Sequence, residues 1–357
     1  MKHGDSTLPR TLIVARDPGA ASALLPVALS GPADVIGLDS ARPVFERGGV
    51  ICVGPWDDSN PEMVTRCLDR LRPDLMLTGT SRKELVLRDG QWWRAGAARD
   101  IPTVALLDHW VGYREKFSAV APYDHLPDVV AVMDEYARQC MLDFGCPADR
   151  LVVTGQPALD GLLGGELSGR IEVRRRWNVG SEDWVVLFAS EPVSQDFGNR
   201  FGYDEQTVLR AVLEAVRGLP MTLVVRPHPR EARDRLQAVV DEAGIPVRYE
   251  SNLTSRQTLA GADTVVGMTS IFLLEAALAG RPVLSVQPGE ALEWTGHFQA
   301  LVMTVKEQSQ IRQWLSDSAN RRPLESKGRA ARNLASGFVS GATQRVWALL
   351  AQQSERN

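Results

Sequence analysis

The chain has 357 residues, of which 44% are hydrophobic and 24% charged, with a formal net charge of -4. This composition is that of an ordinary globular protein, and the length predicts two domains rather than one core. A small negative net charge argues against nucleic-acid binding as the main role, so we expect no nucleic-acid partner. The four cysteines have no paired spacing, which excludes a disulfide framework.

The N-terminal segment lacks the apolar core of a signal peptide, and no apolar run reaches membrane-spanning length. We therefore expect a cytoplasmic protein without an integral membrane segment, and peripheral contact with a membrane is left open.

Short apolar runs alternate with helical segments through the first 160 residues. Such strand–helix–strand repeats require crossover connections, so we expect a parallel sheet with helices on both faces, forming an N-terminal domain over residues 1–160. The expected strands are 11–15, 35–37, 50–53, 74–78, 103–107, 129–133 and 151–154, and the expected helices are 20–29, 61–71, 82–99 and 134–144.

A glycine-dense segment, residues 161–169, is the predicted linker. A second alternating series follows, with strands expected at 184–189, 221–226, 247–249 and 264–266 and helices at 171–177, 205–217 and 231–243. We expect a C-terminal domain over 170–340 and a last helix within 341–357 that packs back on the first domain. The predicted fold class is α/β, with two doubly wound, Rossmann-like domains facing a central cleft.

The segment from Ala262 to Pro288 reads as strand, tight turn, helix and strand. Thr269 or Ser270 is expected to cap the helix, whose free N–H groups and positive dipole end suit a phosphate. Glu275, one turn into that helix, is placed to accept hydrogen bonds from the hydroxyl groups of a sugar. The alternative is an ordinary helix cap with a glutamate on its solvent side.

Loops that follow strands line the ligand crevice of an open parallel sheet. Arg226, His228 and Arg230 lie where one strand ends, and the prolines around His228 restrict its backbone, so we expect an anion site there. Glu191 follows another strand and is expected to face the crevice. The alternative for each is a solvated surface loop.

Asp108 and His109 follow a strand of the first domain and are candidates for a general base. Asp17 and Gly19 follow the first strand, where glycine permits close approach of a ligand and Asp17 can cap the next helix. The alternative is that Asp17 and Asp108 only cap the segments that follow them and that His109 is a structural residue.

The sequence contains no H-x-x-x-H pair, paired C-x-x-C, P-loop or G-x-S-x-G, and no G-x-G-x-x-G follows the first strand. We therefore expect no metal site and no bound cofactor.

The segments from Val224 to Arg230, Gly267 to Ala276 and Gly280 to Val283 resemble the nucleotide-binding half of GT-B fold glycosyltransferases. The likeness is greatest to the branch of CDP-glycerol glycerophosphotransferases, capsule-type glycosyltransferases and UDP-N-acetylglucosamine 2-epimerases. Residues Val152–Pro157, which include Gln156, are similar to the Thr-Gly-Asn motif that ends the first domain in that branch, and Gln156 is therefore expected at the cleft.

The resemblance implies that Thr269 and Ser270 hold the phosphates of a nucleotide-activated donor and that Glu275 holds its ribose. It implies that His228, with Arg226, faces those phosphates and stabilises the leaving nucleotide. Glu191 is also assigned to the donor side.

We therefore expect a metal-independent glycosyltransferase that moves a sugar or related group from a UDP- or CDP-linked donor to a small-molecule or glycan acceptor, in bacterial polysaccharide or glycoconjugate biosynthesis. A UDP-sugar 2-epimerase or hydrolase is the first alternative, and a non-catalytic nucleotide-sugar-binding protein is the second. Epimerases typically have Asp-Ser-Gly-Gly where this chain has Gly267-Met268-Thr269-Ser270, and this difference favours the transferase. The oligomeric state is not predicted.

Overall fold

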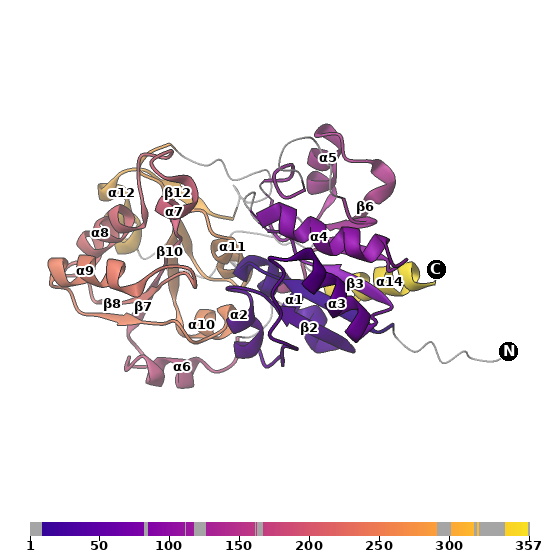
Figure 1. Cartoon of the computed structure of the whole chain (residues 1–357). Helices are drawn as coiled ribbons and strands as arrows, with labels where there is room; N and C mark the ends of the chain where they lie inside the picture. Colours follow the sequence, from indigo (N-terminus) through magenta and orange to yellow (C-terminus); the bar gives the residue numbers. More distant parts are fainter. Residues whose placement is uncertain are drawn as a thin grey trace. The chain divides into compact units, whose positions relative to one another are not determined.

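The computed structural model describes residues 9–81, 85–110, 112–117, 126–160, 162, 167–290, 301–317, 320 and 340–355. The chain divides into two compact units, which we call unit 1 (Met1–Asp160 with Gly337–Asn357) and unit 2 (Gly161–Ser336). Of the predicted linker 161–169, only 162 and 167–169 lie within the described residues. Figure 1 traces both units in the colours of the sequence.

Unit 1 contains a six-stranded sheet in the order β2-β1-β3-β4-β5-β6, and every neighbouring pair of strands is parallel. The strands are β1 (Thr11–Ala15), β2 (Ala33–Gly37), β3 (Leu75–Thr78), β4 (Thr103–Leu106), β5 (Val129–Val132) and β6 (Leu151–Val153). The predicted strand at 50–53 is wrong, because only Cys52 pairs there, through one isolated bridge to Val35.

Helices cover both faces of the unit 1 sheet. Side chains of successive strand residues point to opposite faces, so Ile13 and Ala15 pack with α1 and α14, whereas Leu12 and Val14 pack with α3 and α4. The helices of this unit are α1 (Pro18–Ser30), α2 (Arg42–Arg47), α3 (Pro61–Leu71), α4 (Val86–Ala97), α5 (Glu135–Asp143) and α14 (Ala342–Ser354), with short 3-10 turns η2 (Ala148–Arg150) and η3 (Pro157–Leu159).

Helix α14 comes from the far end of the chain yet belongs to unit 1. Its N-terminus is held by Asp160, whose carboxylate accepts hydrogen bonds from the N–H groups of Ala342 and Thr343. The indole of Trp347 donates to the carbonyl of Val27 and the hydroxyl of Ser30. The last helix therefore packs on α1, next to the sheet.

Unit 2 contains a second six-stranded parallel sheet, in the order β12-β11-β10-β7-β8-β9. Its strands are β7 (Trp184–Ala189), β8 (Met221–Arg226), β9 (Val247–Tyr249), β10 (Thr264–Gly267), β11 (Val283–Val286) and β12 (Met303–Val305). Its helices are α6 (Arg170–Arg176), α7 (Val193–Phe197), α8 (Glu205–Val216), α9 (Arg233–Ala243), α10 (Ser255–Gly261), α11 (Ile271–Leu278) and α12 (Gln308–Ser316).

The strand order places the crevice in each unit. In unit 1 the order reverses at β1 and β3, and in unit 2 it reverses at β7 and β10. In doubly wound sheets, ligands bind beyond the carboxyl ends of the strands at this reversal. None of the helices in the described part of the chain is long and apolar enough to cross a membrane.

Candidate functional site

The turn between β10 and α11 lies at the reversal point of the unit 2 sheet. Gly267 ends β10 against the backbone of β7, where an added Cβ would lie 2.9 Å from the carbonyl oxygen of Ala189. Ser270 is the N-cap of α11, because its hydroxyl accepts the N–H of Phe272 at 3.2 Å. The buried hydroxyl of Ser285 donates to the carbonyl of Met268 at 2.5 Å. The turn is therefore held by the strands on both sides of it.

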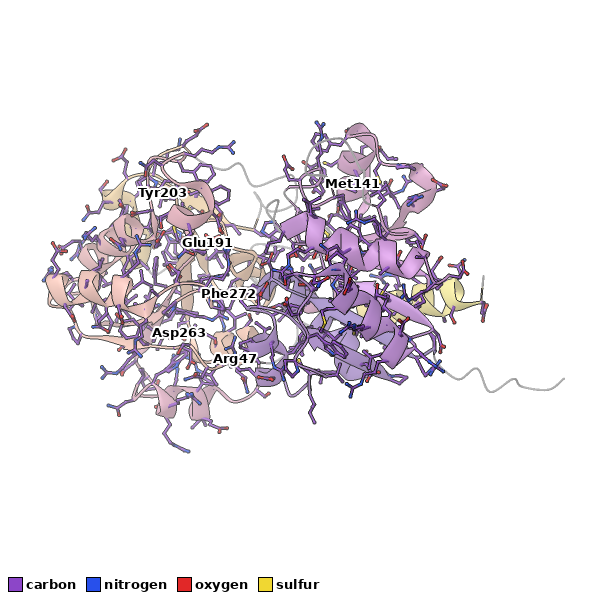
Figure 2. All side chains as sticks on the ribbon, viewed as in Figure 1. Arg47, Met141, Glu191, Tyr203, Asp263 and Phe272 are labelled. Atoms are coloured by element: carbon purple, nitrogen blue, oxygen red, sulfur yellow. The ribbon has the colours of Figure 1, made fainter. Side chains whose placement is uncertain are left out.

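A carboxylate of the same chain binds this turn. Glu191, in the loop after β7 and labelled in Figure 2, accepts the N–H of Thr269 at 2.5 Å and its hydroxyl at 3.0 Å. Burial raises the pKa of Glu191 to about 7, against the opposing effect of hydrogen bonds from Thr269 and the Ser270 N–H. The prediction placed Glu191 facing the crevice, and its carboxylate lies on the α11 turn at the strand reversal, where it binds Thr269.

The end of β8 and the loop after it carry Arg226 and His228. Arg226 lies with its guanidinium carbon 4.5 Å from the centre of the Phe272 ring, in the first turn of α11. Burial, with the positive charges of Arg230 and Arg226, lowers the pKa of His228 to about 3, so its ring is neutral at pH 7. The neutral ring accepts the N–H of Arg230 on Nδ1, which leaves Nε2 as the donor.

Arg230 does not belong to the anion site that the sequence suggested. Both of its terminal nitrogens bind the carboxylate of Asp196, at 2.7 and 2.6 Å. A guanidinium held in this two-point geometry is committed to its partner. Arg226, the last residue of β8, lies against Phe272 of α11.

Glu231 was not singled out from the sequence, although it follows the Pro-His-Pro-Arg segment directly. Its carboxylate accepts the His228 N–H at 2.5 Å and the Ser190 hydroxyl at 2.7 Å, which ties the loop after β8 to the loop after β7. Burial raises its pKa to about 7. The residue therefore holds the backbone of this loop at His228.

Glu275 is buried inside unit 2, with 4% of its surface exposed. Burial raises its pKa to about 7, opposed by the positive charge of Arg226 and a hydrogen bond from Ser255. Its Oε2 atom is buried without a hydrogen-bond partner in the described part of the chain. The suggestion that this glutamate marks the solvent side of α11 is wrong, and its role toward a ribose stays a prediction.

In unit 1, the predicted residues gather around Asp108, just beyond β4. The Asp108 carboxylate binds the ammonium of Lys116 at 2.5 Å and the hydroxyl of Thr80 at 3.1 Å. Burial alone would raise its pKa, but Lys116 brings the pKa below the usual range of an aspartate. Asp108 is therefore an ionised carboxylate at neutral pH. Lys116 has no sequence signal that links it to Asp108.

Gly19 lies directly against this carboxylate. A Cβ at position 19 would be 2.7 Å from Asp108 Oδ2, so the group that approaches the glycine is a side chain of the chain itself. Asp17 occupies the N-cap position of α1, but its side chain makes no capping hydrogen bond, contrary to the prediction. The first helical residue is Pro18, which has no N–H to offer.

Gln156 is 1% exposed, and its amide group is satisfied within unit 1. It donates to the carbonyl of Asp108 at 2.6 Å and accepts the N–H of Ala158 at 3.4 Å. The residue thus links the ends of β6 and β4 rather than presenting its amide at a cleft. His109, next to Asp108, is neutral at pH 7 because burial lowers its pKa to about 4.

A buried charge network at the ends of β1 and β2 was not predicted. Arg16 is 2% exposed and binds Asp39 at 2.7 Å and also Asp58, which is 0% exposed. Asp58 further accepts the indole N–H of Trp92 and a guanidinium N–H of Arg88. These residues are far apart in sequence, so no local pattern could reveal them. Among the described residues, no group of three His, Cys, Asp or Glu side chains forms a metal site.

Two Rossmann-like units, each with polar residues gathered where its strand order reverses, define a GT-B-like α/β protein. Solved structures share this fold. The UDP-GlcNAc 2-epimerase of Neisseria meningitidis bound to UDP-GlcNAc matches with a TM-score of 0.63 at 13% identity, over 96% of this chain and 100% of that chain. Staphylococcus aureus MnaA with UDP matches with a TM-score of 0.62 at 13% identity, over 95% of each chain.

A third solved structure, Anabaena Alr3699/HepE in complex with UDP and glucose, matches with a TM-score of 0.58 at 14% identity, over 98% of each chain. No protein-family model matches the sequence, and no curated protein matches it significantly. At these identities the likeness establishes the fold, which is that of UDP-GlcNAc 2-epimerases and related GT-B-like proteins.

Proposed function

We propose that this chain binds a UDP-linked sugar in unit 2 and acts on it as a 2-epimerase or hydrolase, without a separate acceptor. The observation that carries the proposal is the oxyanion held at the β10–α11 turn, where Glu191 accepts hydrogen bonds from Thr269. A turn that binds a carboxylate through N–H and hydroxyl groups has the donors that a phosphate uses. The three similar structures were solved with UDP or a UDP-sugar, which supports UDP as the nucleotide of the substrate.

The residues around the turn fit the other parts of such a substrate. Arg226 supplies a positive charge for the diphosphate, and the Nε2–H of neutral His228 supplies a hydrogen bond. Glu275 supplies a carboxylate that accepts hydrogen bonds from the ribose hydroxyls. Changing the configuration at C2 of the sugar requires a proton to leave and return at that carbon, so a base is needed. We assign that role to Asp108 or His109 of unit 1.

The test is incubation of UDP-GlcNAc with the protein alone in deuterated water, followed by proton NMR. We expect deuterium to enter at C2, with the epimer or free UDP as product. Unchanged, undeuterated UDP-GlcNAc would contradict the proposal.

Binding is tested separately with Arg226→Ala. Because a charge-assisted hydrogen bond contributes about 1.5–3 kcal/mol, we expect the affinity for UDP measured by calorimetry to fall by roughly 10- to 100-fold. Arg210→Ala is the matched control, since Arg210 lies exposed on α8 and pairs with Glu242. Equal UDP affinity in both variants would remove Arg226 from the site.

Transfer of the sugar to an acceptor is the second candidate. It is favoured by the sequence of the α11 turn, where Met268, Thr269 and Ser270 stand in place of the residues typical of epimerases. In the same NMR experiment a transferase would leave the donor intact until an acceptor such as glucose or a glycan fragment is added.

A further inference from the structure

The hydrogen-bond donors of the β10–α11 turn are already engaged within the chain. Thr269 gives both its N–H and its hydroxyl to Glu191, and the Ser270 N–H also acts on that carboxylate. The Phe272 N–H is taken by the Ser270 hydroxyl, and the Leu273 N–H by the Ser270 carbonyl.

A carboxylate and a phosphate monoanion bind the same hydrogen-bond donors, because each presents two oxygens that share one negative charge to N–H and O–H groups. We propose that the Glu191 carboxylate holds the donors that a substrate phosphate needs, so that a nucleotide binds unit 2 only when Glu191 leaves the Thr269–Ser270 turn. This inference rests on the proposed function and makes Glu191 the residue that sets nucleotide affinity.

The surroundings of Glu191 allow its side chain to leave without refolding the loop. The residue is only partly buried, whereas Val193, two positions later, is 2% exposed and anchors the chain in the core. The nearby carboxyl group of Glu231 disfavours the ionised form of Glu191. In the proposed exchange this one side chain rotates toward solvent and gives up its hydrogen bonds to Thr269.

The competition between Glu191 and phosphate predicts how phosphate affinity changes with pH. An ionised Glu191 competes with phosphate for the donors of the turn and also repels the phosphate by its charge. A protonated Glu191 is neutral, so both effects are much weaker. Since burial raises its pKa to about 7, we expect phosphate to bind more tightly at pH 6 than at pH 8. Other charged or titratable groups surround this loop. The first along the chain are Asp196 on α7, Tyr203 before α8 and Glu205 on α8. The others are Arg226 at the end of β8, His228, Arg230 and Glu231 in the loop after it, and Glu275 on α11.

The comparison of Glu191→Gln with the natural chain isolates the contribution of Glu191 from these groups. UDP-glucose is the probe, because both phosphates of its diphosphate keep their charge from pH 6 to pH 8, unlike the terminal phosphate of UDP. Affinity is measured by calorimetry at both pH values and constant ionic strength. Glu182→Gln is the matched control, since Glu182 is exposed at the opposite end of β7.

We expect the natural chain and the control to bind UDP-glucose up to roughly ten-fold more weakly at pH 8 than at pH 6. Glu191→Gln should bind roughly ten-fold more tightly than the natural chain at pH 8, and its affinity should change less with pH. Equal or weaker binding by Glu191→Gln at pH 8, with the same pH dependence, would overturn the inference. If Glu191→Gln did not fold, the pH dependence of UDP-glucose affinity in the natural chain would test the inference. Equal affinity at pH 6 and pH 8 would overturn the inference.

Absence of UDP-glucose binding in all three proteins would count against the proposed function rather than this inference. The thermal shift in sodium sulfate then tests Glu191 directly, because sulfate needs the same donors but no nucleoside site. A larger sulfate-dependent rise in Tm for Glu191→Gln than for the natural chain would support the inference, and an equal rise would overturn it.

Discussion

Glu275 shows how a buried carboxyl group sets stability and ligand affinity against each other. It is 4% exposed, its Oε2 has no partner in the described part of the chain, and its pKa is raised to about 7. In the unfolded chain this pKa returns to the usual value near 4.5. The folded chain therefore holds a proton that the unfolded chain releases between about pH 4.5 and pH 7, so this group makes the fold less stable as pH rises through that window.

Glu275→Gln should remove that cost. At pH 8.5 the glutamine keeps the shape without the buried charge, and we expect the free energy of unfolding to rise by about 1–3 kcal/mol. At pH 5 the natural carboxyl group is itself neutral, so we expect little difference. Thermal denaturation at the two pH values measures both effects, and the UDP affinity of the same variant should fall if Glu275 holds the ribose.

Glu242→Gln is the control for this experiment, because Glu242 is exposed on α9, where a surface pair contributes little. A stability gain of equal size at pH 5 and pH 8.5 would show that the charge of Glu275 is not its cause. Unchanged UDP affinity would assign Glu275 to the structure alone.

For single residues, the sequence predicts those roles that follow from the residue's place beside the end of a strand or helix. Ser270 as a helix cap follows from its place between a strand and an apolar helix. Arg226 follows from its place as the last residue of a strand, and Glu191 from a strand that ends two residues before it. Asp58 could not be predicted, because its partner Arg16 comes from a distant segment of the chain. Lys116 lies eight residues from Asp108, but the loop between them shows no period that would pair the two. The same limit explains Glu191, whose place in the crevice was predicted but whose partner Thr269 lies 78 residues away.

Among the elements, the strands followed from short, buried, β-branched runs, since strands of a covered parallel sheet are apolar on both faces. The segment at residues 50–53 reads the same way but lies beyond edge strand β2, where it has a neighbour on one side only. Ile51 there is 90% exposed although its neighbours Val50 and Cys52 are buried, so the run is not covered on both faces. Its sequence could not indicate that the sheet ends before it.

Helix α14 illustrates the opposite case, an element whose place depends on the whole fold. Its apolar residues Val346 and Leu350 are fully buried in the core of unit 1, next to α1. Truncating Trp347 to alanine removes an indole that packs in this core and two hydrogen bonds. We expect a loss of about 3–5 kcal/mol in the free energy of unfolding, as for other large-to-small core substitutions.

Hydrogen exchange is the measurement for Trp347→Ala, because a chain with two units need not unfold in one step. Faster exchange should appear in the strands of unit 1 and not in those of unit 2. Met303→Ala is the comparison, since Met303 is half exposed on β12. Uniform loss of protection in both units would mean that α14 stabilises more than unit 1.

At the scale of the whole molecule, the chain builds unit 1, passes through unit 2 and returns to complete unit 1 with α14. The fold class was predictable because alternating strands and helices of this length leave the chain few arrangements. The cleft between the domains stays a prediction, because the sequence patterns of each domain describe that domain alone.

The path of the chain also predicts how nucleotide binding depends on unit 2. All of the residues assigned here to phosphate and ribose, namely Arg226, His228, Thr269, Ser270 and Glu275, come from unit 2, which has its own sheet and core. A fragment of residues 161–336 should therefore bind UDP-glucose within roughly ten-fold of the full chain, a difference of about 1.4 kcal/mol. Circular dichroism first checks that the fragment contains helix and strand. Calorimetry then measures its affinity for UDP-glucose, with Arg226→Ala in the fragment as the control. A folded fragment that binds no UDP-glucose, beside a full chain that does, would show that unit 1 supplies essential contacts to the nucleotide and would move part of the proposed site out of unit 2.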